Sequence, residues 1–310
     1  MILARNALAL VLAGLILADA RLAPAAERAG GAEAAASSRF LRFVDDNEGG
    51  GTLQTAIVTY ENADGVRVDL ISAVHVGETR YYRDLARTFA TYDVLLYEMI
   101  KPRGAPAPVP GMRSGGAITA LQTTLKTLLE LDYQLDAIDY RAPNFVHADL
   151  DAETFERMQA ERGENIFILM LRQMLAEMSR PQPQAPEVTL AELMVALTSP
   201  DRARHFKLIL ARQFQDLEEK LAGFDGPNGS VLVTERNRKA VQVLKQQIAA
   251  GHRNIGIFYG AAHMKGIEEM IAELGFKPTR TEWRVAWDMT AKEGDIIVKV
   301  KRAPATRPAE

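Results

Sequence analysis

Residues 66–98, VRVDLISAVHVGETRYYRDLARTFATYDVLLYE, contain the pattern that decides the fold. Apolar residues run through 66–74, a helix-like stretch follows over 79–92, and a second apolar run covers 94–97. Short apolar runs rich in β-branched residues predict strands, whereas apolar residues spaced three and four apart predict a helix. A strand, a helix and another strand in this order are typical of an α/β fold.

The C-terminal part of the chain repeats this alternation of strands and helices. Turn-forming Asp64 and Gly65 also predict a hairpin that joins the first apolar run to an earlier one over 52–60. The whole pattern predicts an α/β fold with a mixed β-sheet flanked by helices. The further predicted elements are a helix over 234–250, a strand over 255–259, a helix over 265–274, and strands over 281–287 and 295–300.

The middle of the chain differs, because its pattern is mainly helical, with a proline-rich break over 181–186. A loop over 101–116, with four prolines and four glycines, precedes it and is expected to border the site. Residues from about 117 to 225 are therefore predicted to form a largely helical insertion in the α/β domain. The predicted helices of this insertion cover 117–135, 151–179, 188–198 and 201–222.

The N-terminus has the features of an export signal. Arg5 precedes an apolar run over 7–18, and small residues up to Ala20 suit cleavage. We therefore expect an exported protein, periplasmic or extracellular, in a bacterial envelope. An uncleaved segment that anchors the chain in the membrane is the alternative. The predicted divisions are a signal peptide over 1–20, a disordered linker over 21–38, the α/β domain over 39–301 and a disordered tail over 302–310.

Composition excludes several classes of function. The chain of 310 residues has no cysteine, which excludes thiolate catalysis and cysteine-bound zinc or iron–sulfur sites. Its net charge of -3 gives no reason to expect nucleic acid as a partner. The sequence motifs typical of nucleotide hydrolysis, serine esterases and zincin peptidases do not occur in it. Histidine and carboxylate side chains remain as the candidates for chemistry.

Three predicted strands are followed by a residue that can bind a metal or transfer a proton. His75, Glu98 and His263 each come within four residues of the end of such a strand. In an open α/β sheet, ligands bind in the crevice beyond the carboxyl ends of the strands. We therefore expect these three side chains to converge at one edge of the sheet.

The side chains expected at this edge suit metal-assisted hydrolysis. Two neutral imidazoles and a carboxylate are a suitable ligand set for Zn, Mn, Fe or Co. Such a metal lowers the pKa of a bound water and polarises a carbonyl. The alternative is that each histidine caps the following helix or hydrogen-bonds a neighbour in the core.

Two further pairs of residues are candidates for the site. Arg236 and Asn237, near the start of a predicted helix, could hold a substrate carboxylate or an oxyanion. The alternative for this pair is a charged cluster on a solvated helix end. His147 and Asp149 could line the site and contact the substrate. The alternative for Asp149 is to cap the helix that follows it.

These residues occur in motifs that resemble the TraB/PrgY/Tiki family, also called the TraB/GumN family. The similarity covers about 50–105 and 230–277, and the segment G-A-A-H-x-x-G with its upstream E-R-N is fairly specific. The first motif departs from the family pattern at Ser72, which stands where the family has glycine. The matching positions are His75, Glu98, Arg236, Asn237, Gly260 and His263.

The resemblance implies a fold similar to erythromycin-esterase-like and haem-uptake ChaN-like proteins, with the site at the strand ends. Tiki members are described as metal-dependent proteases that use Mn or Co and act on secreted peptides. TraB/PrgY members are linked to binding or inactivating peptide pheromones. The family therefore implies a class of chemistry and a peptide or small-molecule substrate, but not one particular reaction.

Together these patterns lead to the hypothesis of an exported, peptidase-like, metal-dependent hydrolase that uses Mn, Co or Zn. His75 and His263 would be metal ligands, and Glu98 a ligand or general base. Arg236 and Asn237 would hold the substrate or the oxyanion. One alternative is a non-catalytic envelope protein that binds a peptide or small ligand in the same cleft. Another is an esterase-like enzyme that uses histidine and glutamate as acid and base without a metal.

Overall fold

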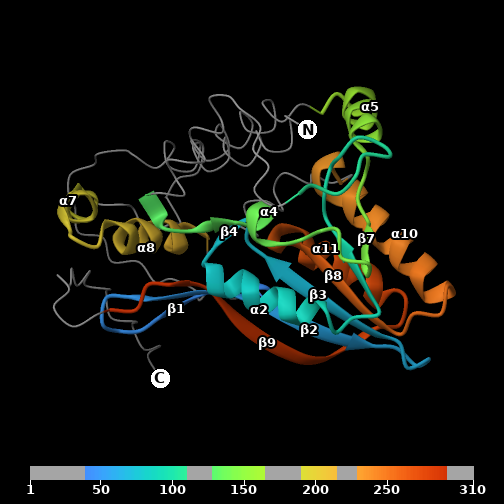
Figure 1. Cartoon of the computed structure of the whole chain (residues 1–310), viewed down its shortest axis with the longest axis horizontal. Coiled ribbons are helices and arrows are strands. Elements are labelled where there is room, and N and C mark those ends of the chain that lie inside the picture. Colours follow the sequence, from blue (N-terminus) through green and yellow to red (C-terminus); the bar gives the residue numbers. More distant parts are fainter. Residues whose placement is uncertain (1–38, 110–127, 165–189, 215–228, 292–310) are drawn as a thin grey trace, which may run out of the picture.

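The computed structural model describes residues 39–109, 128–164, 190–214 and 229–291 (Figure 1). None of the described helices is long and apolar enough to cross a membrane. Several predicted segments lie outside the described residues: the signal peptide over 1–20, the linker over 21–38, the strand over 295–300 and the tail over 302–310.

The main sheet contains both antiparallel and parallel strands. Its strands are β1 (Leu41–Asp45), β2 (Gly51–Glu61), β3 (Arg67–Ala73), β5 (Val94–Tyr97), β7 (Phe145–His147), β8 (Asn254–Gly260) and β9 (Lys277–Asp288). They are ordered β1-β2-β3-β8-β5-β7, and β9 pairs with β2. Strand β2 is antiparallel to its three neighbours, whereas β3, β8, β5 and β7 are parallel. The predicted α/β fold with a mixed sheet is therefore confirmed.

Strand β2 is paired along both edges. Strand β9 pairs with 52–61 along one edge, while the other edge is divided between β1, opposite 51–55, and β3, opposite 57–61. The predicted hairpin joins β2 to β3, and its Gly65 has φ +71°. That φ lies in the left-handed region, which glycine adopts without the strain of a Cβ. The hairpin prediction is confirmed.

The parallel half of the sheet positions the candidate site. Helix α2 (Thr79–Phe89) connects β3 to β5, while α10 (Arg236–Ala249) precedes β8 and α11 (Ala261–Ala272) follows it. Because β3, β8, β5 and β7 run in the same direction, their carboxyl ends lie at one edge. The residues that follow these strands therefore come together in space, although they are far apart in the sequence.

Helices cover both faces of this sheet (Figure 1). Helix α2 packs on one face, where its Leu85 joins Ile71 of β3 in a buried cluster. Helices α10 and α11 pack on the other face, where Ile267 joins Leu70 in a second cluster. Successive strand residues point to opposite faces, so a strand covered on both sides is apolar without alternation. This explains the uninterrupted apolar runs in the sequence.

The predicted helix over 117–135 is wrong at its C-terminal end. Glu130 has φ +53°, and the chain then forms strand β6 (Asp132–Tyr133) and the short helix α4 (Gln134–Ala137). Strand β6 pairs with β4 (Val76–Gly77), which directly follows His75. This tertiary pairing prevents the helix from continuing, and it brings the insertion next to the candidate site.

Other helix boundaries also differ from the prediction. The helix expected over 265–274 begins at Ala261, so His263 lies in its first turn and not in a preceding loop. The helix expected over 151–179 is described as α5 (Ala152–Arg162), which ends where Gly163 has φ +63°. Helices α7 (Leu190–Thr198) and α8 (Arg202–Phe214) agree with the helices expected there, but the insertion predicted over about 117–225 is not helical at β7, which pairs with β5 in the main sheet.

Gly256 of β8 lies where a side chain has no room. A Cβ placed on it would be 2.5 Å from Leu95 Cδ1 and 3.0 Å from the ring of Tyr92. We predict that Gly256→Ala lowers the free energy of unfolding by about 1–3 kcal/mol, the usual cost of overpacking. Urea unfolding followed by circular dichroism measures this change. The exposed Lys265→Ala is the control, with an expected change below about 0.5 kcal/mol; equal stability of the two variants would contradict the packing.

Candidate active site

The three residues predicted at strand ends come together around Gly260. A Cβ placed on Gly260 would lie 3.3 Å from Glu98 Oε2, 3.6 Å from His75 Nε2 and 4.0 Å from His263 Cδ2. The first two side chains follow β3 and β5, and the third lies in the first turn of α11 after β8. Glycine at this position leaves the space between them open.

Glu98 is held by two charge-assisted hydrogen bonds. Its Oε2 accepts the backbone N–H of Gly260 at 2.7 Å, and its Oε1 accepts Arg236 Nη2 at 2.6 Å. Burial by itself raises the pKa of Glu98, but the charge of Arg236, with the two histidines, holds that pKa well below its usual range. Glu98 is therefore a carboxylate in the folded protein.

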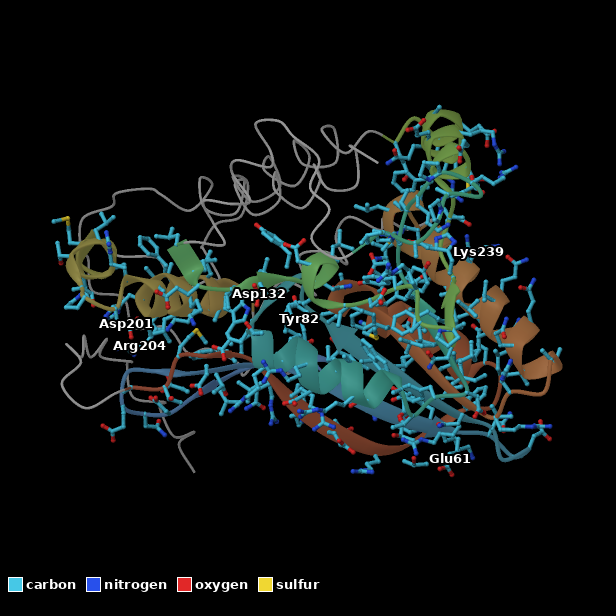
Figure 2. All side chains as sticks on the ribbon, in the orientation of Figure 1. Glu61, Tyr82, Asp132, Asp201, Arg204 and Lys239 are labelled. Carbon is cyan, nitrogen blue, oxygen red and sulfur yellow. The ribbon has the colours of Figure 1, made fainter. Side chains whose placement is uncertain are left out.

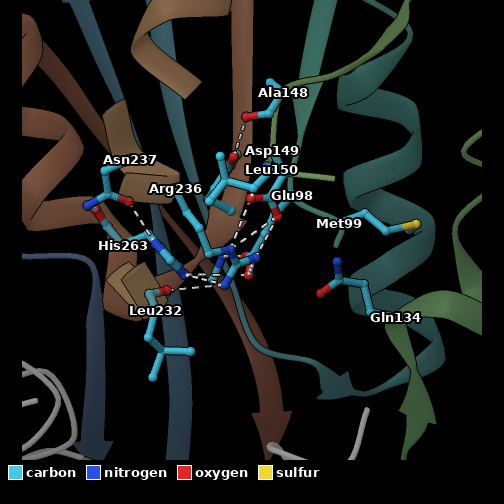
Figure 3. A network of polar contacts seen from close by, with 12 residues as sticks. Glu98, Met99, Gln134, Ala148, Asp149, Leu150, Leu232, Arg236, Asn237 and His263 are labelled. Atoms are coloured by element: carbon cyan, nitrogen blue, oxygen red, sulfur yellow. Dashed lines mark hydrogen bonds and ion pairs between the residues drawn. The ribbon is translucent and has the colours of Figure 1, made fainter. Parts of the chain in front are cut away.

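Arg236 lies at the centre of the network, between two carboxylates (Figure 3). Its Nε and Nη2 donate to Asp149 at 3.0 and 2.6 Å, and its Nη1 donates to the Leu232 carbonyl at 3.4 Å. Burial lowers the pKa of Arg236, but Asp149 and Glu98 together raise it above its ordinary value. Arg236 is 7% exposed, and its donors contact the protein's own groups in this structure.

Asn237 fixes the orientation of His263. The ring nitrogen Nδ1 of His263 lies 2.7 Å from Asn237 Oδ1, and Asn237 Nδ2 donates to the His263 carbonyl at 3.3 Å. The amide oxygen can only accept, so the ring proton lies on Nδ1 and the lone pair on Nε2. That Nε2 lies 3.3 Å from Arg236 Nη1 and 3.5 Å from Glu98 Oε1. Asn237 is 1% exposed and lies close to Gly266, where a Cβ would be 2.5 Å from Nδ2.

The backbone around His75 is anchored from two sides. Tyr82, which lies on α2 (Figure 2), donates its hydroxyl hydrogen to the Val74 carbonyl at 2.9 Å, and the Gln134 N–H donates to the His75 carbonyl at 3.0 Å. Burial lowers the pKa of His75, although the charge of Glu98 opposes this effect. Neutral imidazole is the form of this side chain that can accept a proton or bind a metal.

The sequence did not predict what Asp149 and His147 contact. Asp149 is 1% exposed and pairs with Arg236, while Asp151 caps α5 by accepting the Thr154 N–H at 2.8 Å. His147 is half-buried, and its Nε2 lies 2.6 Å from the Met99 carbonyl. Their predicted contact with substrate stays a prediction. The signal that could have identified Asp149 is its position just after a strand parallel to the one that precedes Glu98.

Several donors suitable for a metal meet at this site, but they are engaged with each other. Within the described ranges, no three histidine or carboxylate side chains are spaced as around a bound cation. Arg236 contacts both Glu98 Oε1 and His263 Nε2, so these two atoms already have a partner in this structure. The metal-ligand role of His75, Glu98 and His263 remains a prediction.

A separate pocket lies at the other end of the strands. Its polar lining includes Arg67 and Asp69 near the start of β3 and Glu282 and Arg284 of β9. These side chains are paired among themselves, because Arg67 binds Asp69 and Arg284 binds Glu282 at 2.7 Å. The residues predicted to carry the chemistry lie at the carboxyl end of the strands and do not line this pocket.

Comparison with protein-family models, curated proteins and solved structures gives no match to this chain. The resemblance to the TraB/PrgY/Tiki family therefore stays a prediction from the two motifs. The geometry of the described residues supports the functional argument.

Asp149 is the partner that balances the buried charge of Arg236. We predict that Asp149→Asn lowers the free energy of unfolding by about 3 kcal/mol, because removing one member of a buried ion pair leaves the other uncompensated. Chemical unfolding measures the change. Asp151→Asn is the matched control, because asparagine caps a helix as well as aspartate does. A loss no larger than that of the control would show that Arg236 does not depend on Asp149.

Glu98 makes the stability of the fold depend on pH. Its folded pKa lies below the ordinary value of 4.5, so its ionised form stabilises the folded state above that pH and the stabilisation is lost as pH falls below it. We predict that the wild type is more stable than Glu98→Gln at neutral pH and that this difference shrinks on acidification below about pH 4.5. Unfolding in chelator-containing buffers across the acid range measures it. A difference independent of pH would contradict the assignment.

Proposed function

We propose that this protein is a hydrolase of peptide or similar amide bonds, with its site at the carboxyl ends of β3, β5 and β8. The observation that supports this proposal is the convergence of His75, Glu98 and His263 around Gly260. A neutral imidazole, a carboxylate and an oriented second imidazole are the groups that activate water and transfer protons during hydrolysis. The family resemblance directs the proposal toward peptides and an exported protein.

The donor set has the chemistry of a divalent metal site. His75 and His263 supply imidazole nitrogen and Glu98 supplies carboxylate oxygen, which suits Mn, Co or Zn. With neutral imidazoles, Asp149, Arg236 and Glu98 give the cluster one net negative charge, which favours a cation. A cation held there supplies Lewis acidity, lowering the pKa of water and polarising a substrate carbonyl.

Arg236 and Asn237 have positioning roles in this proposal. Both are buried, and their polar atoms contact Glu98, Asp149 and His263 in the free protein. Arg236 keeps Glu98 ionised, and Asn237 accepts from Nδ1 of His263, so that the lone pair on Nε2 is placed next to Arg236 Nη1. Partners of this kind orient first ligands in metal sites and acid–base groups in metal-free ones.

A second candidate function is hydrolysis by acid–base catalysis without a metal. The observation that favours it is the contact of Arg236 with both Glu98 Oε1 and His263 Nε2. In this arrangement His75 Nε2 faces the open space next to Glu98 and is the group available to remove a proton from water. The two candidates use the same residues and differ in the requirement for a cation.

Metal content separates the two candidates. We predict that the exported form, purified without chelator, retains about one Mn, Co or Zn ion per chain, because three side chains are the usual protein ligand set of a catalytic site. His75→Ala and His263→Ala should each lose the metal, as measured by elemental analysis. His252→Ala is the control, since His252 lies before β8, at its opposite end. A metal-free wild type that is still active would select the acid–base candidate.

Hydrolysis of a peptide library tests the reaction itself. We predict that Glu98→Gln lowers activity at least about 100-fold, the usual contribution of a positioned acid–base group. Product formation is followed by mass spectrometry, with Glu61→Gln at the far end of β2 as the control. Binding of peptides without cleavage by the wild type would instead support an envelope binding protein.

A further inference from the structure

Gln134 is a buried polar residue next to His75. It is the first residue of α4, it follows the short pairing of β6 with β4, and it is 6% exposed. Its backbone N–H donates to the His75 carbonyl at 3.0 Å, which ties α4 to the strand end that carries the histidine. Figure 3 shows the amide of Gln134 directed toward the side of the network that contains Glu98.

The orientation of the Gln134 amide is determined by Tyr140. The Nε2 group of Gln134 donates to the Tyr140 hydroxyl at 2.7 Å. Tyr140 is itself buried, and its ring packs on Tyr97 at the end of β5 with 5.1 Å between centroids. Because the amide nitrogen is engaged on that side, the amide oxygen points away from Tyr140.

That oxygen, Oε1, is buried and has no hydrogen-bond partner among the described residues. An unsatisfied buried acceptor costs about 1–3 kcal/mol, so a donor within reach is expected to be used. The side chain of Gln134 raises the pKa of the His75 imidazole, whereas burial lowers that pKa by a larger amount. The acceptor end of an amide is the part that stabilises a ring N–H, so the buried Oε1, which has no partner in the described part of the chain, is the atom of Gln134 suited to a donor on the His75 ring.

The other groups that act on His75 leave one ring nitrogen for this contact. Glu98, Arg236 and His263 are the charged or titratable neighbours, and Glu98 Oε2 and His75 Nε2 lie on the same side, within 3.3 and 3.6 Å of the Cβ position of Gly260. Nδ1 is therefore the nitrogen that remains for Gln134.

We propose that Gln134 is a positioning residue for His75: its Oε1, unpartnered among the described residues, is the acceptor for Nδ1–H of the ring, which leaves the lone pair on Nε2 for the open space by Gly260. The same arrangement holds on the other side of the site, where Asn237 Oδ1 faces Nδ1 of His263. Each histidine is thereby oriented by a neutral carboxamide. A carboxamide holds the tautomer without adding a charge to a buried cluster that already contains two carboxylates and a guanidinium.

The consequence for catalysis rests on the proposed function. A lone pair on Nε2 of both histidines leaves both rings able to accept a proton from water or to bind a cation at the same open space. In the opposite tautomer, His75 would present Nε2–H to this space, so that Nε2 could neither accept a proton from water nor bind a cation there. The tautomer itself can be measured whether or not the protein is a hydrolase.

The test is the tautomer of His75 in chelator-treated, ¹⁵N-histidine-labelled protein, at alkaline pH where the imidazoles are neutral. Long-range ¹H–¹⁵N spectra distinguish a protonated ring nitrogen from one with a lone pair, and the His75→Ala spectrum assigns the signals. We expect Nδ1 protonated and Nε2 unprotonated in the wild type. A proton on Nε2, directed at Glu98, would overturn the proposal.

Three variants connect this tautomer to Gln134. Gln134→Leu should give a mixture of tautomers, and Tyr140→Phe a smaller shift, because it removes only the acceptor that orients the amide. Gln134→Glu retains an oxygen acceptor and should keep Nδ1 protonated, even if Gln134→Leu does not fold. Gln54→Leu is the control, since Gln54 accepts from Arg42 at 2.8 Å in the antiparallel part of the sheet. An unchanged tautomer in a folded Gln134→Leu protein would overturn the proposal.

Metal content and peptide hydrolysis are measured on the same proteins, so that the two proposals fail separately. A wild type with the expected tautomer but with neither metal nor activity would remove the proposed function and leave the role of Gln134. A hydrolase whose His75 has the opposite tautomer would do the reverse. In a hydrolase, Gln134→Leu should lower kcat at least about tenfold with a smaller change in KM, because Gln134 acts on the tautomer of His75 and does not itself contact the substrate.

Discussion

The buried guanidinium of Arg236 is the group on which the arrangement of the site depends. It contacts Asp149 after β7, Glu98 after β5 and His263 in α11, and it comes from the start of α10. A charge in this environment is tolerated only if it is paired and hydrogen-bonded. Asp149 pairs with Arg236 on one side, and Glu98 pairs with it on the other. Glu98 remains an ionised carboxylate, and its Oε2 lies next to the open space by Gly260.

The fold makes this network possible by aligning strand ends. Strands β3, β8, β5 and β7 are parallel, and each is followed at its carboxyl end by a residue of the network or by one close to it. The two apolar clusters on the faces of the sheet hold the strands in this register. The polar residues then extend beyond the sheet, where no strand competes for their hydrogen bonds.

Prediction from the sequence succeeded where the signal was local. The hairpin at Gly65, the helix after His75 and the strand before Gly260 follow from turn chemistry and periodicity, and all three are present. It was wrong at the end of the helix expected over 117–135, because β6 pairs with β4 across a long stretch of chain. Local propensity does not reveal a pairing between strands so far apart in the sequence. Gln134 lies in the same segment, directly after β6.

The sequence alone therefore determined the class of fold, the absence of cysteine chemistry and the positions of His75, Glu98 and His263 shortly after three strands. It could not determine that Arg236 would be buried and paired with Asp149 and Glu98, since a guanidinium at the start of a helix has several possible partners. Only the tertiary structure decided this. Burial removes water as the alternative partner, so a guanidinium must be satisfied by whichever carboxylates the aligned strand ends bring within reach.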